Sequence, residues 1–149
     1  MATVYGVNKT KALTPTPANV LNPGLLGGKV RCMVDKYECA ATAAGTIIEV
    51  GQKLEKGAKI LEVILASDNL ANNTTLQVGD YEDDDRYIAA TDHGAAALIT
   101  RMTSAGAADA IGYEVDETTA ATLDSQIIIT TGVGEATGTI SIAILYTVE

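Results

Sequence analysis

The stretch from Lys53 to Ile88 constrains the fold most, because it breaks into short segments separated by turns. A turn at residues 55–58 precedes an apolar run from Ile60 to Ala66, and a polar bend at 67–73 follows that run. Short apolar runs bounded by turns are typical of strands, since helices need longer segments. The stretch therefore predicts the middle of an all-β sandwich.

Comparable segments recur along the rest of the chain. The clearest runs from Thr139 to Val148, where isoleucines alternate with smaller residues. The interior must be built from Ile, Val, Leu and Ala, because the chain has no Trp or Phe, and this β-branched bias favours strands. The expected strands are 29–39, 46–50, 59–66, 74–78, 87–88, 111–115, 125–131 and 139–148. Such a pattern favours a β-sandwich, with a jelly roll as the preferred form and the strand order left open.

Three local features are expected besides the strands. Alanine-rich residues 95–103 have apolar positions spaced for one helical face and predict a single short helix. The apolar phase of the first strand slips at Asp35–Lys36, which indicates a β-bulge. The glycine-rich loop at 132–138 is interpreted as a hairpin-type connection.

The run from Lys59 to Ala66 is apolar on both faces of the expected strand, with only Glu62 breaking one set. Such a strand is either covered on both sides or lies at a subunit interface. In a two-layer sandwich one face should be solvated, so this run favours oligomerisation.

Residues 1–28 are expected to form an extended arm ahead of a single sandwich domain at 29–149. Three prolines favour extended chain, and glycines punctuate the end of the segment. Its apolar residues need a surface to cover them, either on the chain's own domain or, as we favour, on a neighbouring subunit. The candidate contact residues are Val4, Tyr5, Val7, Val20, Leu21, Leu25 and Leu26.

The charge balance excludes some partners. With a formal charge of −9, the 149-residue chain lacks the basic surface that supplies most affinity for nucleic acids or anionic membranes. A basic protein partner is compatible with this charge. The longest apolar run is far too short to span a bilayer, and the N-terminus has no apolar core typical of a signal peptide, so the protein is expected to remain in the compartment where it is made.

The acidic turn at 80–85 is the one candidate for a metal site, since four Asp and one Glu lie within six residues. Its spacing does not match an EF-hand loop. We interpret it as a solvated turn whose charges meet Arg86, with a bound Ca²⁺ as the alternative that the sequence leaves open. We assign no metal ligands and expect no cofactor.

Catalytic arrangements are not apparent. Asp92, His93 and Ser104 allow a triad hypothesis, but no nucleophile elbow accompanies them, and we expect His93 to be a surface residue in a loop. Cys32 and Cys39 lie at an odd spacing in one strand, which places them on opposite faces and argues against a disulfide. The sequence favours a non-enzymatic protein.

Five phrases of the chain carry a resemblance to a known group: MATVYGVN, LNPGLLGGKVRCMVDKYE, LEKGAKILEVIL, TTLQVGDYEDDDRYI and ATGTISIAILYTVE. Together they resemble small virion structural proteins of tailed bacteriophages, and most of all the proteins that decorate or cement the capsid. The resemblance covers most of the chain and is weakest from Asp92 to Asp124.

The resemblance implies a β-sandwich or jelly-roll protein on the capsid exterior, assembled in the host cytoplasm. Its partners would be the major capsid protein and itself, as a homotrimer. It would bridge adjacent capsid subunits and stabilise the head. The alternative is a receptor- or carbohydrate-binding sandwich of a head fibre or tail tip, in which Tyr81, Tyr87 and Tyr113 would stack on sugars. A third hypothesis, a small hydrolase using Asp92 and His93, is ranked last.

Overall fold

The computed structural model describes residues 4, 7–13, 16, 27–71, 73–102, 110–115 and 125–148. Eight strands and one short helix lie within these ranges. They are α1 (Val7–Leu13), β1 (Val30–Thr42), β2 (Ile47–Glu49), β3 (Lys59–Ser67), β4 (Thr75–Gly79), β5 (Ile88–Asp92), β6 (Leu98–Arg101), β7 (Ile128–Gly132) and β8 (Ala136–Thr147). The chain is an all-β sandwich, as the sequence predicts.

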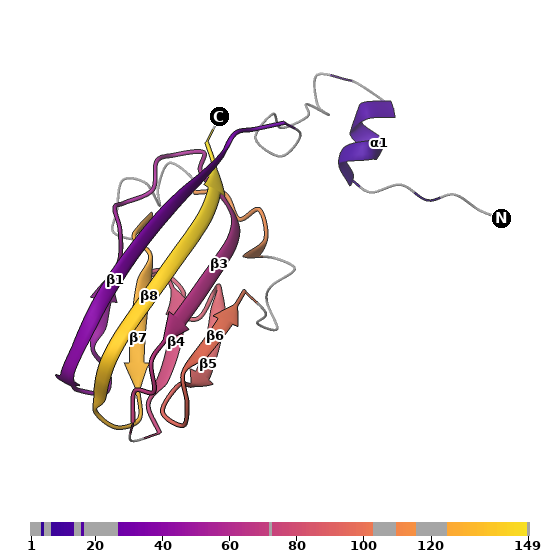
Figure 1. Ribbon diagram of the computed structural model, residues 1–149. Coiled ribbons are helices and arrows are strands. Elements are labelled where there is room, and N and C mark those ends of the chain that lie inside the picture. Colours follow the sequence, from indigo (N-terminus) through magenta and orange to yellow (C-terminus); the bar gives the residue numbers. More distant parts are fainter. Residues whose placement is uncertain are drawn as a thin grey trace.

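The strands form two four-stranded antiparallel sheets (Figure 1). Sheet I has the order β1-β8-β3-β6, and sheet II has the order β2-β7-β4-β5. Neighbours within a sheet are mostly distant in sequence: the long strands β1 and β8 pair from Val30 opposite Thr147 to Thr42 opposite Ala136. The first and last strands of the domain are therefore held together along nearly their whole length.

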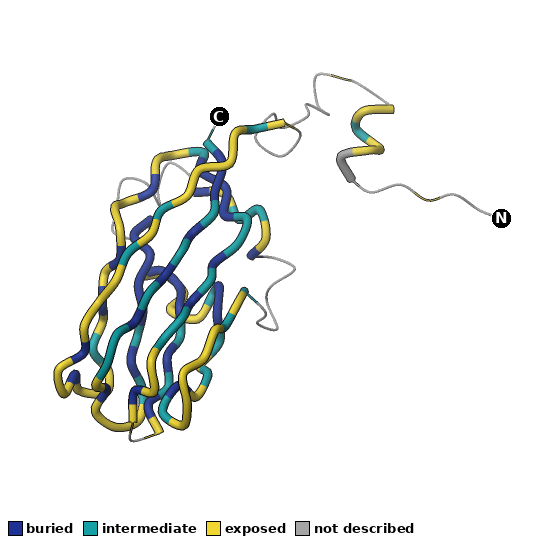
Figure 2. Tube along the Cα trace, in the orientation of Figure 1, coloured by how far each residue is buried: buried dark blue, intermediate teal, exposed yellow. Residues whose placement is uncertain are grey.

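The core lies between the two sheets and is aliphatic, as expected from the composition. On β8 the alternating residues Ile140, Ile142 and Ile144 are buried. Ile142 and Ile144 lie beside Leu65 and Val63 of β3 on the same face of sheet I. Sheet II contributes Leu76, Val78 and Ile129 from the opposite side. Figure 2 shows the result: buried and partly exposed positions alternate along β8 and β3, whereas β1 is exposed over most of its length.

The prediction of a helix at residues 95–103 is wrong. Residues Leu98–Arg101 form strand β6, which pairs with β3 at the edge of sheet I. A four-residue segment is too short for periodicity to distinguish strand from helix, and pairing with β3 decides its conformation.

The described helix lies instead within the expected arm, where we predicted extended chain. Helix α1 ends at Leu13, two residues before Pro15. The positive charge of Lys11 in its last turn interacts favourably with the helix dipole. Figure 1 shows it apart from the sandwich. Within the described part of the chain, no helix is long and apolar enough to cross a membrane.

Three further expectations are corrected. The register of β1 is regular through Asp35–Lys36, and its irregularity lies between Ala40 and Thr42. The loop after β7 joins strands of different sheets and is not a hairpin. Residues 111–115 make only one isolated bridge, between Lys59 and Glu114, rather than a strand.

Candidate interaction surface

Sheet I presents a second apolar face, directed away from the core. Because opposed residues of antiparallel strands share a face, the pairing defines three rows across the sheet. The rows are Cys32–Leu145–Glu62, Val34–Ala143–Ile64–Arg101 and Lys36–Ser141–Ala66–Ile99. We call this surface the open apolar face. Its aliphatic side chains are half-buried or exposed, and Val34 and Ile99 are 64% and 67% exposed.

The charges of the open apolar face lie at its margins and are of both signs. Arg101 of β6 forms an ion pair with Glu62 of β3. Lys36 lies on the edge strand β1, and nearby Glu38 accepts a hydrogen bond from Thr139 Oγ1 at 2.8 Å. Asp68, directly after β3, adds a third carboxylate, so two cations face three anions on this surface, in a chain whose formal charge is −9.

A hollow opens on the same side of sheet I, next to Ile99. It is open to solvent and has a volume of about 510 Å³, and its lining includes the small residues Ala66, Ala97 and Ser141 together with Lys36, Asp68 and Ile99. Ile99 forms part of its wall and projects into solvent. The open apolar face thus carries a projection and a depression side by side.

Sheet II has a different outer surface, which we call the acidic face. Its central row is Ile47–Thr130–Gln77, and the next row is Glu49–Ile128–Gly79. The turn at 80–85 folds back over this second row: a Cβ on Gly79 would lie 2.0 Å from the carbonyl oxygen of Asp83. Ile128, although it is not part of the core between the sheets, is only 1% exposed. The chain therefore closes part of this face itself.

Asp80 organises the acidic turn. Its buried carboxylate accepts hydrogen bonds from the backbone N–H groups of Glu82 (3.1 Å) and Asp83 (2.9 Å) and from Arg86 Nε (2.8 Å). Arg86 also pairs with Glu82 at 3.0 Å, as the sequence led us to expect. Burial raises the pKa of Asp80 above its usual value, while the bond to Arg86 opposes that shift. These contacts fix the turn against sheet II.

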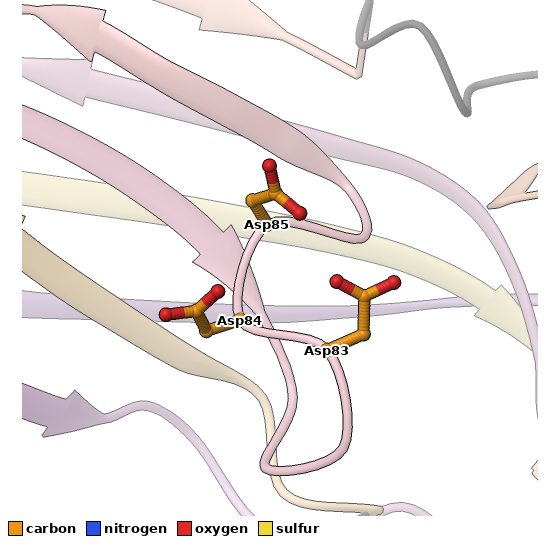
Figure 3. Close-up of side chains that lie close together, drawn as sticks. All are labelled: Asp83, Asp84 and Asp85. Carbon is orange, nitrogen blue, oxygen red and sulfur yellow. The ribbon is translucent and has the colours of Figure 1, made fainter.

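The carboxylates of Asp83, Asp84 and Asp85 project from successive positions of this loop between β4 and β5 (Figure 3). One ligand atom from each lies within 4.8 Å of the others, and all three side chains are exposed. A hydrogen bond with Asp83 raises the pKa of Asp85. Calcium takes six to eight oxygens, so a site at these three exposed carboxylates would need water or other ligands to complete it.

The expectation for His93 is wrong: it is fully buried. Its Nδ1 lies 2.7 Å from Ser67 Oγ of β3, and its Nε2 lies 3.2 Å from Thr100 Oγ1 of β6. Burial lowers the pKa of His93, and the neighbouring Asp92 carboxylate opposes that effect. Because a buried imidazole cannot reach a substrate, this arrangement is a structural tie between strands. Ser104, the third member of the triad hypothesis, lies outside the described residues.

The tyrosines do not form a sugar-stacking platform. Tyr87 is buried, and its ring meets Tyr113 edge-on at a centroid distance of 6.5 Å. The guanidinium of Arg86 lies 4.2 Å from the centre of the Tyr113 ring and covers that face. Of the three tyrosines named for sugar stacking, Tyr81 alone is exposed, and its hydroxyl donates to Glu49 at 2.6 Å. The carbohydrate-binding alternative therefore loses two of its three expected residues.

The remaining candidate residues have the following places. Cys32 is exposed on the open apolar face and Cys39 is buried in the core, and both are free, as the spacing predicts. Of the arm residues, Val4 is 90% exposed and Val7 begins α1. Tyr5, Val20, Leu21, Leu25 and Leu26 lie outside the described residues.

The sequence analysis predicted only the part of the open apolar face on β3 and missed the rest, although two signals pointed to the whole. The apolar residues of β1 change face at Asp35–Lys36, so that Cys32 and Val34 point outward while Cys39 points inward. The apolar residues on both faces of β3 were the second signal.

Comparison with known proteins gives matches among solved structures only; no protein-family model and no curated protein matches the chain. A chain in the capsid asymmetric unit of cyanophage Pam1 superposes with a TM-score of 0.66 at 23% identity, over 83% of this chain and 87% of that one. A chain in the capsid of Ralstonia phage GP4 gives a TM-score of 0.59 at 26% identity, over 82% of this chain and 86% of that one.

The similarity to the Pam1 chain establishes the fold. The GP4 chain has the same fold and a somewhat higher sequence identity. Both matched structures are phage capsids, in agreement with the resemblance seen in the sequence. This similarity favours a non-enzymatic role. The protein is similar to structural components of phage capsids, and the similarity supports a structural role in a phage virion.

Proposed function

We propose that the protein binds the outer surface of a phage capsid and cements adjacent subunits of the major capsid protein, thereby stabilising the head. The observation that carries the proposal is the likeness to chains of two phage capsids over more than four-fifths of the sequence. We further infer that it acts on the capsid exterior after assembly in the host cytoplasm.

The strand order supports a capsid-type fold. All but one of the seven successive connections, β4 to β5, change sheet, and β1 and β8 end as neighbours in sheet I. We interpret this as an eight-stranded jelly roll, an architecture used by viral capsid proteins.

The physical basis of cementing is the addition of many weak contacts. Each bound copy would cover apolar surface on two capsid subunits, and separating those subunits would then expose that surface to water. Many copies acting together resist outward pressure even where each contact is weak. The acidic face, already closed by its own turn, suits the solvent side of such a layer.

The arm is the proposed tether. We infer that its apolar residues, from Val4 to Leu26, cover a neighbouring subunit, and the 90% exposure of Val4 supports this. An arm that precedes the sandwich can reach across a subunit boundary while the domain stays on one side of it.

The proposal is tested with emptied heads of the phage that encodes the protein. We expect the full chain to sediment with the heads and to raise the temperature at which they open. A variant lacking residues 1–27 should bind far fewer copies while retaining the circular dichroism spectrum of the sandwich. Equal binding by the truncated variant would refute the role of the arm, and failure of the full chain to bind any heads would refute cementing.

A further inference from the structure

The open apolar face carries complementary shapes within one surface. Ile99 projects from edge strand β6 with 67% of its surface exposed. Beside it lies the hollow of about 510 Å³, whose lining includes Ala66 and Ser141. These two residues and Ile99 occupy one row across β8, β3 and β6. A surface that holds both a projection and a matching depression can receive another copy of itself.

The charge distribution favours the same occupant. Two copies of a chain with charge −9 repel one another over most of their surfaces, and the acidic face adds to that repulsion. The open apolar face is the exception, because Lys36 and Arg101 offset two of its three carboxylates, Glu38, Glu62 and Asp68, around an aliphatic centre. A second copy meets the least repulsion, and opposite charges at the rim, when it approaches this face.

The fold supplies a flat platform for such a contact. The central residues Ala143, Ser141 and Ala66 are small, while Val34 and Ile99 project at the two edge strands. Sheets pack face to face about 10 Å apart when side chains of the two surfaces interdigitate. Desolvating these aliphatic groups supplies the attraction.

We propose that the open apolar face is the surface through which copies of this chain associate, with Ile99 of one copy entering the hollow beside Ser141 of the next. Ile99 stands at the wall of the hollow, and a contact in which it enters the hollow of the next copy serves a two-fold pair or closes a ring of three. This inference deepens the proposed function, since it names the self-association surface of a capsid-bound protein, but its test uses no capsid.

Sedimentation velocity on the full-length chain measures the association directly. We expect the wild-type chain to form a multimer, and Ile99→Asp to weaken its association about 100-fold or more, because a carboxylate would enter an apolar contact. The matched control is Ile47→Asp: Ile47 is also an exposed strand isoleucine, 48% exposed, but lies on the acidic face. This control should assemble like the wild-type chain.

A second variant tests the contact from its other side. Ser141→Arg places a long side chain across the hollow and should also yield monomers, while circular dichroism and thermal unfolding verify that both variants remain folded. A monomeric wild-type chain overturns the proposal, as does a folded Ile99→Asp or Ser141→Arg that assembles normally. Binding of heads is scored separately, so that a monomer that binds heads refutes this inference alone and a multimer that ignores heads refutes the proposed function alone.

Discussion

The two outer surfaces of the sandwich are built from similar antiparallel strands, yet the chain treats them differently. On sheet II the acidic turn folds over Gly79 and leaves Ile128 only 1% exposed. On sheet I, Val34 and Ile99 remain more than half exposed. Covering apolar surface is favourable wherever a cover is available, so an uncovered face in a stable fold indicates that its cover comes from outside.

This difference predicts that the two faces respond in opposite ways to substitution. Changes beneath the acidic turn should lower the stability of the chain, because the turn is part of its own fold. Changes on the open apolar face should affect association and leave stability nearly intact.

The largest effect on stability is expected for Asp80→Ala. The substitution removes the acceptor for two backbone N–H groups and for Arg86, and it should cost about 3 kcal/mol of unfolding free energy. Urea denaturation measures this loss. Asp84→Ala, at an exposed position of the same turn, is the control and should change the free energy by less than about 0.5 kcal/mol. Equal effects would show that the turn is not anchored by Asp80.

A smaller loss is expected for Gly79→Ala, because its Cβ would collide with the backbone of Asp83 and Asp84. The turn must move away, at a cost of about 2 kcal/mol. Gly132→Ala is the matched control on the same sheet, since its Cβ would meet mainly the side chain of Thr75, which can rotate. A Gly79→Ala protein as stable as the control would mean that the turn does not close the acidic face.

The third prediction concerns pH. Because the pKa of His93 is lowered in the folded protein, the unfolded chain binds a proton more readily between the folded pKa and the usual value of 6.5. Above pH 6.5 the neutral His93 makes its full contribution to the free energy of unfolding. That contribution is lost as the pH falls from 6.5 towards the pKa of His93 in the folded protein, at about 1.4 kcal/mol for each pH unit between these two pKa values.

His93 contacts Thr100 of β6, so acidification should also loosen the strand that carries Ile99. Hydrogen exchange should therefore accelerate in β6 at low pH more than in β2, which lies on the acidic face. His93→Gln should remove the pH dependence in this window. Uniform acceleration in both strands would contradict the assignment.

The smallest effect is expected for the ion pair between Arg101 and Glu62 on the open apolar face. Arg101 is 58% exposed, so solvent screens the pair, and a double-mutant cycle with alanine at both positions should give less than about 1 kcal/mol of unfolding free energy. If the coupling energy between Arg101 and Glu62 were as large as the loss of unfolding free energy for Asp80→Ala, the open apolar face would contribute to the stability of the chain as much as the acidic turn does.

The sequence predicted the sandwich because seven of the eight strands carry their own pattern. The alternation from Ile140 to Ile144 specifies a buried face of β8 directly. Strand order and sheet membership lay beyond reach, since a glycine-rich loop such as 132–138 is compatible with a hairpin or with a crossover between sheets. Strand β6 was missed because only its pairing with β3 distinguishes it from a helical turn.

The surfaces were predictable only in part. The pairing of Arg86 with carboxylates of the acidic turn follows from their closeness in sequence. The burial of His93 was not predictable in this way, because its partner Ser67 is distant in sequence and its partner Thr100 lies in β6, the strand that was missed. The outward residues of β1 had the right pattern, but the phase change was explained by a bulge. A strand with apolar residues on both faces shows the same change of phase in the sequence as a strand with a bulge. Only the regular pairing of β1 with β8 shows that the first explanation is correct.

The most direct test counts copies of the protein on emptied heads for the wild-type chain, Ile64→Lys and Gln77→Lys. Ile64 and Gln77 are both partly exposed residues of central strands, one on the open apolar face and one on the acidic face. Our account predicts on the order of hundreds of copies for the wild-type chain and for Gln77→Lys. It predicts at least a tenfold reduction for Ile64→Lys, because a chain that cannot associate through the open apolar face loses the multivalency of its contacts with the head. A wild-type chain that binds in only a few copies, or an Ile64→Lys protein that binds as well as Gln77→Lys, would contradict it.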